Sequence, residues 1–192
     1  MSEQSDTAQK ILSVAQRLVQ ERGYNAFSYG DIAEELGIRR AAIHYHFPCK
    51  NDLGRGLVVR YREACRQLLQ QIDLETEDPQ DKLRRYIQTH REMLQDGQMC
   101  LCGMLAAEVT TLSDAIAAEV KAFFSEHEMW VTQVLLRGRK LGVFDYKGQP
   151  EATARMLLSS LEGAMLIARS QGDLNQFHCV AQELLAGLGI KT

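Results

Sequence analysis

The side chains best suited to contacting a nucleic acid lie close together, between positions 39 and 50. Arginine pairs with the O6 and N7 acceptors of guanine, tyrosine packs on sugars and thymine methyl groups, and histidine and lysine hold phosphates. From Leu36 to Arg66 the chain has seven Lys or Arg residues and two acidic ones, a local charge of +5 in a protein of formal charge −3. This patch favours local phosphate contact, with a solvated basic helix face as the alternative. The side chains are Arg39, Arg40, His44, Tyr45, His46 and Lys50.

The residues around this cluster have the spacing of two short helices that cross at a tight turn. Ala33 is small enough for a helix crossing, Gly37 tolerates a positive φ in the turn, and Ile43 supplies an apolar plug. Ser28, with Asp31 three residues later, predicts a capped helix start. The spacing therefore predicts a helix-turn-helix whose second helix leaves its outer face free to enter a groove of duplex DNA. Apolar backing comes from Ile32, Leu36 and Ile38.

Three short motifs make up this stretch: Ser28-Tyr29-x-x-Ile32-Ala33, Leu36-Gly37-Ile38 and His44-Tyr45-His46-Phe47-Pro48-Cys49-Lys50-x-Asp52-Leu53. In these motifs the chain resembles the N-terminal domain of the TetR-type transcriptional repressors. Beyond them, only the length and the helical layout are similar to that family. The residue types and this resemblance together predict that double-stranded DNA is contacted by Ser28, Tyr29, Arg39, Arg40, His44, Tyr45, His46 and Lys50.

The sequence departs from the usual pattern of that family at three positions. Arg39 stands where a small polar residue is common, Ala42 where threonine is common, and His44 where tyrosine is common. A base preference is therefore not implied, and for His44 a ring packed on the helix crossing is the alternative role. The resemblance divides the chain into a DNA-binding domain, residues 1–50, and a ligand-binding and dimerisation domain, residues 51–192.

The composition is that of an ordinary globular protein, with 192 residues, 45% apolar and 24% charged. No apolar run approaches the length of a membrane span, and the N-terminus MSEQSDTAQK is too polar for a signal peptide. The five cysteines have no framework spacing, and the Cys and His residues lack the spacing of a zinc site. We therefore expect a cytoplasmic protein with reduced thiols, no metal, no cofactor and no membrane partner.

The apolar residues recur every three to four positions, and the chain has only three prolines. This pattern predicts an all-α protein of about nine helices: an N-terminal three-helix head with the helix-turn-helix, and a C-terminal helical bundle body. The only candidate for a long irregular loop is 138–148. The predicted helices begin near Asp6 or Thr7, at Ser28, near Arg39, near Cys49, at Pro79, in the stretch 99–112, after Ser113, at Pro150 and after Asp173; the first ends at Gly23 and the fourth near Ile72.

The last two predicted helices carry more apolar side chains than a body of this size can hide. We expect them to pair with the same helices of a second chain in a four-helix interface, as the resemblance also implies. Such a homodimer would read a near-palindromic operator with half-sites about one helical turn apart, or somewhat more. The apolar residues are Leu157, Leu158, Leu161, Met165, Leu174, Phe177, Val180, Leu184 and Leu185.

The resemblance further implies that a small-molecule effector binds in the body and changes the separation of the two heads. Polar or aromatic side chains on inward-facing stripes are the candidates for contacting an effector of unknown chemistry. Each of them has an alternative role as a core residue whose polar atoms are satisfied within the protein. The candidates are Tyr61, Tyr86, His90, Glu108, His127 and Trp130.

A second way of sensing a signal involves Cys100, close to a predicted helix start. A thiol in the first turn of a helix interacts with the helix dipole, which favours the reactive thiolate. Cys102 lies two residues further on, so on a helix the two thiols point in nearly opposite directions. We therefore expect one of them to face the interior and the other to lie elsewhere. The alternative is that both are small buried side chains.

Two other classes of function compete with a DNA-binding regulator. A helical-bundle enzyme is disfavoured because no Glu is followed three residues later by His, and no glycine-rich phosphate loop is present. An interaction protein whose head binds another protein would share the fold, but its binding to duplex DNA would not depend steeply on salt. The sequence thus predicts a homodimeric repressor without catalytic residues, released from DNA by a small molecule or by thiol modification.

Overall fold

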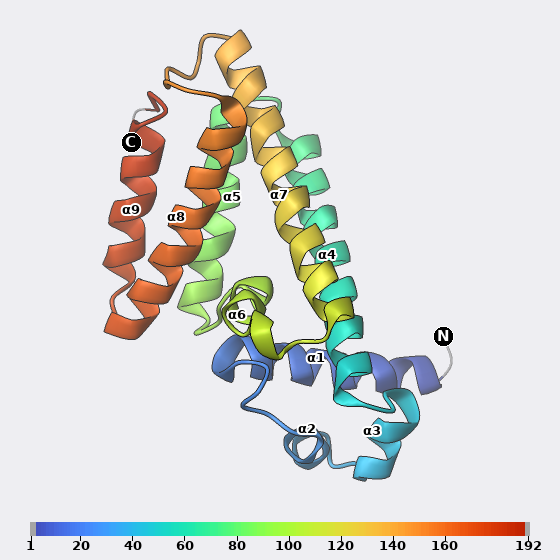
Figure 1. The fold of residues 1–192 in the computed structure, drawn as a ribbon. Helices are drawn as coiled ribbons and strands as arrows, with labels where there is room; N and C mark the ends of the chain where they lie inside the picture. Colours follow the sequence, from blue (N-terminus) through green and yellow to red (C-terminus); the bar gives the residue numbers. More distant parts are fainter. Residues whose placement is uncertain (1–2, 191–192) are drawn as a thin grey trace. The chain divides into compact units, whose positions relative to one another are not determined.

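A computed structural model describes residues 3–190, which form nine α-helices and one short 3₁₀-helix (Figure 1). The all-α fold is thereby confirmed. Two compact units share the helices: one runs up to Ala64 and includes Cys100–Phe123, and the other contains Cys65–Met99 and the residues from Phe124 onward. The elements are α1 (Glu3–Arg22), α2 (Tyr29–Leu36), α3 (Arg40–His46), α4 (Lys50–Glu75), α5 (Pro79–Gln95), α6 (Leu101–Ala107), η1 (Val109–Thr111), α7 (Asp114–Lys140), α8 (Pro150–Gln171) and α9 (Leu174–Ala186).

The first unit is built on α1, which contacts α2, α3 and α6. Ile11, Ala15 and Leu18 form a fully buried stripe on α1, as their three-to-four-residue spacing predicts. The Arg60 guanidinium ties α4 to α1 by donating hydrogen bonds to the Gln9 carbonyl, at 3.2 Å, and to the Gln16 side chain, at 2.8 Å. These contacts join α1 and α4 within the unit that contains the helix-turn-helix.

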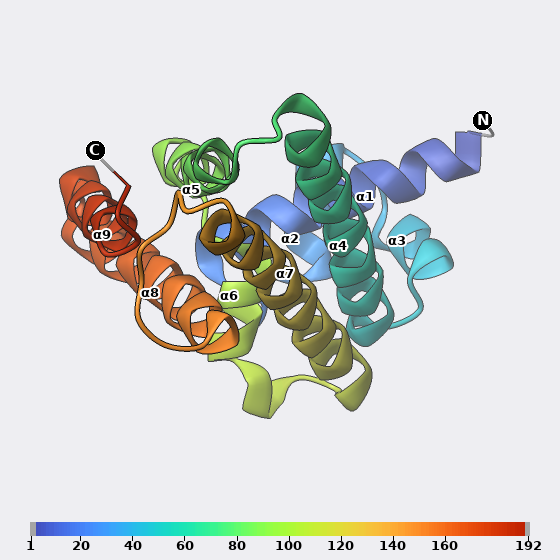
Figure 2. The same cartoon turned by 90° about the horizontal axis from the view of Figure 1, so that it is seen from above.

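The second unit contains α5, α8 and α9 together with the later parts of α4 and α7. Helices α8 and α9 lie side by side, and both contact α5 (Figure 2). Most of the apolar residues predicted to meet a second chain are buried inside this single chain instead, because α5, α8 and α9 pack their apolar stripes against one another. The residues concerned are Leu157, Leu158, Leu161, Met165, Phe177 and Leu185.

Several helix ends differ from the prediction. Helix α1 begins at Glu3, and Asp6 does not start it; the Asp6 carboxylate lies 2.6 Å from the Lys10 ammonium, an i,i+4 pair typical of a helix interior. Helix α4 continues to Glu75, three residues beyond the predicted end. A capping residue marks the end of a helix reliably only where its side chain bonds to the backbone. Without such a bond, the sequence predicts a helix end less accurately.

The predicted loop at 138–148 is shorter than expected, because α7 continues through Gly138 to Lys140. Phe144 folds back over this glycine: a Cβ at Gly138 would lie 2.0 Å from Cδ2 of Phe144. The Val143 N–H then donates a 3.0 Å hydrogen bond to the Gly138 carbonyl. The glycine is therefore needed for close packing of the ring and does not break the helix.

The described residues meet the requirements of neither a membrane-spanning helix nor a metal site. Among residues 3–190, no helix is both long enough and apolar enough to cross a membrane. In the same residues, no three His, Cys, Asp or Glu side chains are grouped so that they could hold a metal ion.

Candidate nucleic-acid interface

Helices α2 and α3 contact each other through the small and apolar residues that the spacing predicts. Ala33 and Ile43 are buried, and Gly37 has φ +63°, the left-handed conformation that glycine adopts without strain. The N–H of Ile38 closes the turn with a 3.0 Å hydrogen bond to the carbonyl of Ala33. The predicted helix-turn-helix is confirmed down to its turn geometry.

The start of α2 has the predicted reciprocal cap. The Ser28 hydroxyl accepts a 3.1 Å hydrogen bond from the Gly30 N–H, and the Asp31 carboxylate accepts one of 2.7 Å from the Ser28 N–H. The Ser28 hydroxyl also donates to Asp31, and these bonds lower the pKa of the Asp31 carboxyl. Both residues have a structural role, and exposure of Ser28 leaves its hydroxyl within reach of a phosphate.

The outer face of α3 is open to solvent and carries most of the predicted DNA contacts. Tyr45 is 71% exposed, so its ring is available to contact a nucleic acid. Arg39 and Arg40 at the N-terminal end of α3 are also exposed, while His46 is half-buried beside Tyr45, with ring centroids 5.2 Å apart. The Arg40 guanidinium lies against Gly30 of α2: a Cβ added to Gly30 would be 2.6 Å from Nη2 of Arg40.

Tyr29 and His44 brace the crossing in addition to lining its surface. The Tyr29 hydroxyl donates a 2.8 Å hydrogen bond to the carbonyl of Phe47, directly after α3, and burial raises the pKa of this phenol. The His44 ring lies 4.8 Å from the Tyr29 ring, and its Nδ1 lies 3.2 Å from the Pro48 carbonyl. His44 therefore packs on the crossing while remaining exposed at its edge.

Lys50 points into the head. Its ammonium donates a hydrogen bond to the Phe27 carbonyl and lies 4.3 Å from the centre of the Phe27 ring and 4.8 Å from that of Tyr24. Partial burial lowers the pKa of Lys50, and the carboxylates of Glu108 and Asp31 oppose that shift. In this conformation Lys50 links the start of α4 to the segment that precedes α2.

Cys49 occupies the capping position at the start of α4. Its N–H and its thiol both donate to Oδ2 of Asp52, at 3.2 and 3.0 Å. The Asp52 carboxylate thus caps the Cys49 N–H, which is one half of a reciprocal cap.

Four of the seven predicted effector contacts gather in the second unit. The Tyr86 hydroxyl and Nδ1 of His127 share a 2.9 Å hydrogen bond, and Nδ1 of His90 donates to the Tyr86 carbonyl at 3.0 Å. The Trp130 ring packs on the Tyr86 ring with centroids 5.4 Å apart. Burial lowers the pKa of His90. Burial, and to a lesser degree repulsion between the two rings when both are protonated, lowers the pKa of His127 to about 4. Both imidazoles are therefore neutral at pH 7.

The other three residues of that set belong to the first unit. Tyr61 packs on Phe123 with ring centroids 5.6 Å apart. The thiol of Cys100 caps α6 by accepting a hydrogen bond from the Gly103 N–H, at 3.4 Å. Glu108 binds the backbone at the end of α1. These contacts give each of the three a structural role; whether any of them meets an effector remains a prediction.

The expectation that one of Cys100 and Cys102 would leave the interior is wrong. Cys100 is 2% exposed and Cys102 is fully buried. Cys100 lies just before α6, at its cap, and not within the helix, so the two thiols are not constrained to opposite directions.

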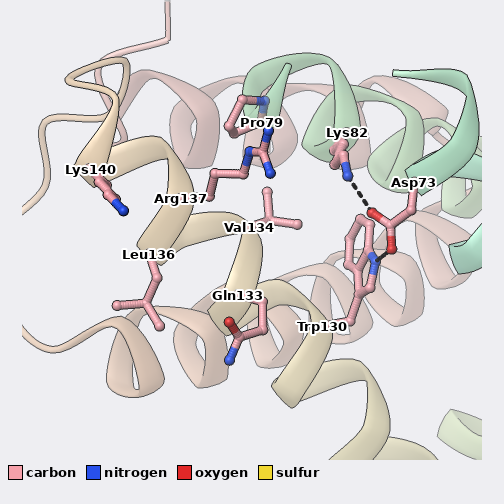
Figure 3. A pocket seen from close by; sticks show the side chains of 9 residues that line it. All are labelled: Asp73, Pro79, Lys82, Trp130, Gln133, Val134, Leu136, Arg137 and Lys140. Atoms are coloured by element: carbon pink, nitrogen blue, oxygen red, sulfur yellow. Dashed lines mark hydrogen bonds and ion pairs between the residues drawn. The ribbon is translucent and has the colours of Figure 1, made fainter. Parts of the chain in front are cut away.

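A cavity of about 630 Å³ opens in the second unit beside Trp130 (Figure 3). It is lined by Asp73, Lys82, Arg137 and Lys140, none of which was singled out from the sequence. The pattern did contain one signal: Lys82 stands four residues before Tyr86, on the same buried stripe of α5 as that tyrosine. A buried lysine on an apolar stripe indicates an ionic partner or a ligand.

The helix crossing, the glycine turn and the exposed basic face of α3 together define a helix-turn-helix DNA-binding protein. Residues 11–55 match the family described as bacterial regulatory proteins, tetR family, and residues 79–183 match the transcriptional regulator LmrA/YxaF-like, C-terminal domain.

Known relatives agree with these matches along the whole chain. A TetR-family transcriptional regulator from Agrobacterium tumefaciens is 35% identical; the structures align with a TM-score of 0.94 over 97% of this chain and 99% of that one. A TetR transcriptional regulator from Legionella pneumophila is 30% identical, with a TM-score of 0.87 over 100% and 99%. The HTH-type transcriptional repressor DhaR of Mycobacterium sp. (strain GP1) is 28% identical over 92% of this chain and 91% of the relative.

The chain belongs to the TetR family of bacterial transcriptional regulators. It is therefore a DNA-binding regulator of transcription, as are the relatives named above.

Proposed function

We propose that the protein is a homodimeric repressor that binds a near-palindromic operator through α3 and leaves it when a small molecule binds the second unit. The exposed basic and aromatic face of α3 carries this proposal, because Tyr45, 71% exposed, stands next to two exposed arginines on the helix that follows the Gly37 turn. Repression is supported by the relative DhaR, whose name describes a repressor.

On this proposal the DNA-contacting residues divide into two groups. Arg39, Arg40 and Tyr45 contact bases and sugars in the major groove. Ser28, His46 and Lys50 hold phosphates; Lys50 exchanges the Phe27 carbonyl for a phosphate when DNA binds. Tyr29 and His44 keep α2 and the end of α3 in register, and they meet the backbone of the DNA at their exposed edges.

The proposed dimer forms through the outward faces of α8 and α9. Four aliphatic side chains remain exposed there, Val180 and Leu184 are half-buried, and Ser159, Ser160 and Gly163 allow close approach of another helix. A symmetric pair of such faces would bury these side chains against their copies. The four exposed residues are Met156, Leu166, Ile167 and Leu174.

Release by a reversible ligand is favoured over release by thiol modification. Cys100 and Cys102 are both buried, so an electrophile reaches them only when the unit opens. The cavity beside Trp130, in contrast, is present in the folded chain.

The experiment that tests this proposal compares Arg40→Ala with Arg84→Ala, a change at an exposed arginine of α5. Binding to the duplex upstream of the chain's own gene is measured beside binding to a scrambled duplex. If Arg40 reads a base, Arg40→Ala weakens specific binding by about 1–3 kcal/mol and nonspecific binding much less. Equal losses on both duplexes make Arg40 a phosphate contact. Wild-type binding without any preference or salt dependence favours a head that binds a protein.

A further inference from the structure

The cavity beside Trp130 has the size of a site for a small organic ligand. Its volume of about 630 Å³ falls within the range of about 300–1,000 Å³ that such sites occupy. Three helices of the second unit line it: α4 contributes Asp73, α5 contributes Pro79 and Lys82, and α7 contributes the rest (Figure 3). The residues from α7 are Trp130, Gln133, Val134, Leu136, Arg137 and Lys140.

The charges on the cavity wall favour an anion. Three cationic side chains and one carboxylate line it, in a protein whose formal charge is −3. The two oxygens of that carboxylate, Asp73, are already bonded: the Lys82 ammonium lies 2.5 Å from Oδ1, and the Trp130 indole N–H donates to Oδ2 at 3.0 Å (Figure 3). The charges of Asp73 and Lys82 therefore offset each other, and Arg137 and Lys140 leave the cavity wall with a net positive charge.

Lys82 is prepared to donate to an anion. It is 8% exposed, and an ammonium group has three N–H donors. Among the described residues, Asp73 is its hydrogen-bond partner, which leaves two donors for ligand oxygens. An ammonium with donors to spare can form charge-assisted hydrogen bonds to an anion, which are stronger than neutral ones.

Arg137 and Lys140 add two more cations one turn apart at the end of α7. Arg137 donates to Glu77 at 2.5 Å, but this pair is exposed and contributes little to stability. The guanidinium fork keeps further N–H donors, and such a fork matches the oxygens of a carboxylate or phosphate. The two side chains can therefore hold an anionic head group without breaking a buried contact.

The remaining wall suits an apolar body. Trp130, Pro79 and Val134 present apolar surface to the cavity. The bond to Asp73 holds the indole in place, and the Tyr86 ring packs on it with centroids 5.4 Å apart. A flat or aliphatic group can lie against this fixed ring while its charged end reaches the cations.

We propose that this cavity binds a small organic anion, a carboxylate, phosphate or sulfonate joined to an apolar body, and that such an anion is the effector. The effector role rests on the repressor function proposed above, whereas binding of the anion does not. Lys82, Arg137 and Lys140 hold the charged group of the ligand, and Trp130 contacts its apolar part.

A pair of fluorescent probes tests the site, since Trp130 is the single tryptophan of the chain. Anilinonaphthalene sulfonate carries the anionic group, and N-phenylnaphthylamine has the same aromatic body without it. Energy transfer from Trp130 to each probe is measured during titration of the full-length protein. The proposal predicts transfer to the sulfonate, with an affinity at least about tenfold higher than for the neutral probe, the gain of a charge-assisted hydrogen bond. Equal affinities, or no transfer to either probe, would overturn it.

Charge-removing variants show whether the predicted cations hold the probe. Arg137→Gln and Lys140→Gln change exposed side chains, so the fold is retained. Each is expected to weaken sulfonate binding about tenfold and to leave the neutral probe unaffected. Lys147→Gln, in the exposed loop after α7, removes the same charge away from the cavity and is the control. If all three variants bind alike, the cations of this cavity do not hold the anion.

The effector role is tested separately on the complex with operator DNA. Saturating sulfonate is expected to release wild-type protein from the duplex, and Arg137→Gln should need about tenfold more probe. Charge-dependent binding without release overturns the effector role. A protein that never binds the duplex contradicts the proposed function instead, and the titration without DNA still decides whether the anion site exists.

Discussion

The carboxylate of Glu108, just after α6, accepts a hydrogen bond from the backbone N–H of Tyr24, just after α1, at 3.1 Å. The second carboxylate oxygen accepts from the N–H of Asn25 at 2.9 Å. Oε1 also occupies the space of a side chain at Gly23, where a Cβ would lie 2.3 Å away. Glu108 thus fixes residues 23–25, the connection from α1 to the helix-turn-helix, within the unit that contains all of them.

Glu108→Ala should destabilise the protein by about 1–3 kcal/mol, because the N–H groups of Tyr24 and Asn25 both lose a charged acceptor. Urea unfolding measures the loss. Glu108→Gln keeps one acceptor oxygen and should cost less. Glu34→Ala, at an exposed carboxylate of α2, is the control and should stay within about 0.5 kcal/mol of wild type. An unchanged unfolding midpoint for Glu108→Ala would show that this contact carries no stability.

Acidification should destabilise the second unit through the buried His127. The folded pKa of His127 is about 4 and the unfolded value is about 6.5, so below pH 6.5 the unfolded chain binds a proton that the folded chain refuses. Stability is therefore lost as the pH falls from about 6.5 to 4, by about 3 kcal/mol. The free energy of unfolding, measured across this range, should decline less steeply in His127→Gln than in wild type. His178→Gln, at an exposed histidine, should follow wild type; identical slopes in all three would refute this account.

Two glycines of the first unit should respond to alanine for different reasons. Gly54 lies in α4, where a Cβ would come 2.6 Å from Cδ1 of Ile116 and 2.8 Å from the Tyr24 hydroxyl. Gly54→Ala should therefore cost about 1–3 kcal/mol by overpacking, and trimming Ile116 to Val in the same chain should recover part of it. Gly37→Ala meets no neighbour and should cost about 1–2 kcal/mol from its positive φ alone, with no recovery. Thermal unfolding of the single and double variants separates the two cases.

The proposed dimer face can be tested with a charge. Ile167→Glu places a carboxylate among the exposed aliphatic residues of α8 and should produce monomers with weaker operator binding. Leu74→Glu alters an aliphatic residue of α4 that is even more exposed, and it should leave the dimer intact. Sedimentation velocity reads the oligomeric state directly. A dimer that survives Ile167→Glu would move the interface away from this face.

Features determined by neighbouring residues could be predicted from the sequence. The Ser28 and Asp31 cap, the Gly37 turn and the cap at Asp78 before Pro79 each depend on side chains within three or four positions of one another. Their chemistry is local, so the residue types alone determine the geometry. The helix-turn-helix was predictable for this reason.

Features that depend on distant parts of the chain could not be predicted. Glu108 and Tyr24 are 84 residues apart, and nothing in either local sequence indicates their contact. The ion pair of Lys82 with Asp73 and the cover of Phe144 over Gly138 depend in the same way on how helices pack. The apolar stripes of α8 and α9 were recognised, but periodicity alone does not say whether α5 or a second chain covers them.

The most direct test of the central claim is the binding of the full chain to a duplex from its own upstream region, followed by fluorescence anisotropy at increasing salt. If α3 reads an operator as proposed, affinity for this duplex exceeds that for a scrambled one by roughly 10³-fold or more, and log K falls steeply with log salt. The complex should also contain an even number of chains on a near-palindromic site. Equal and salt-independent binding to both duplexes would contradict the assignment of α3 as the DNA-reading element.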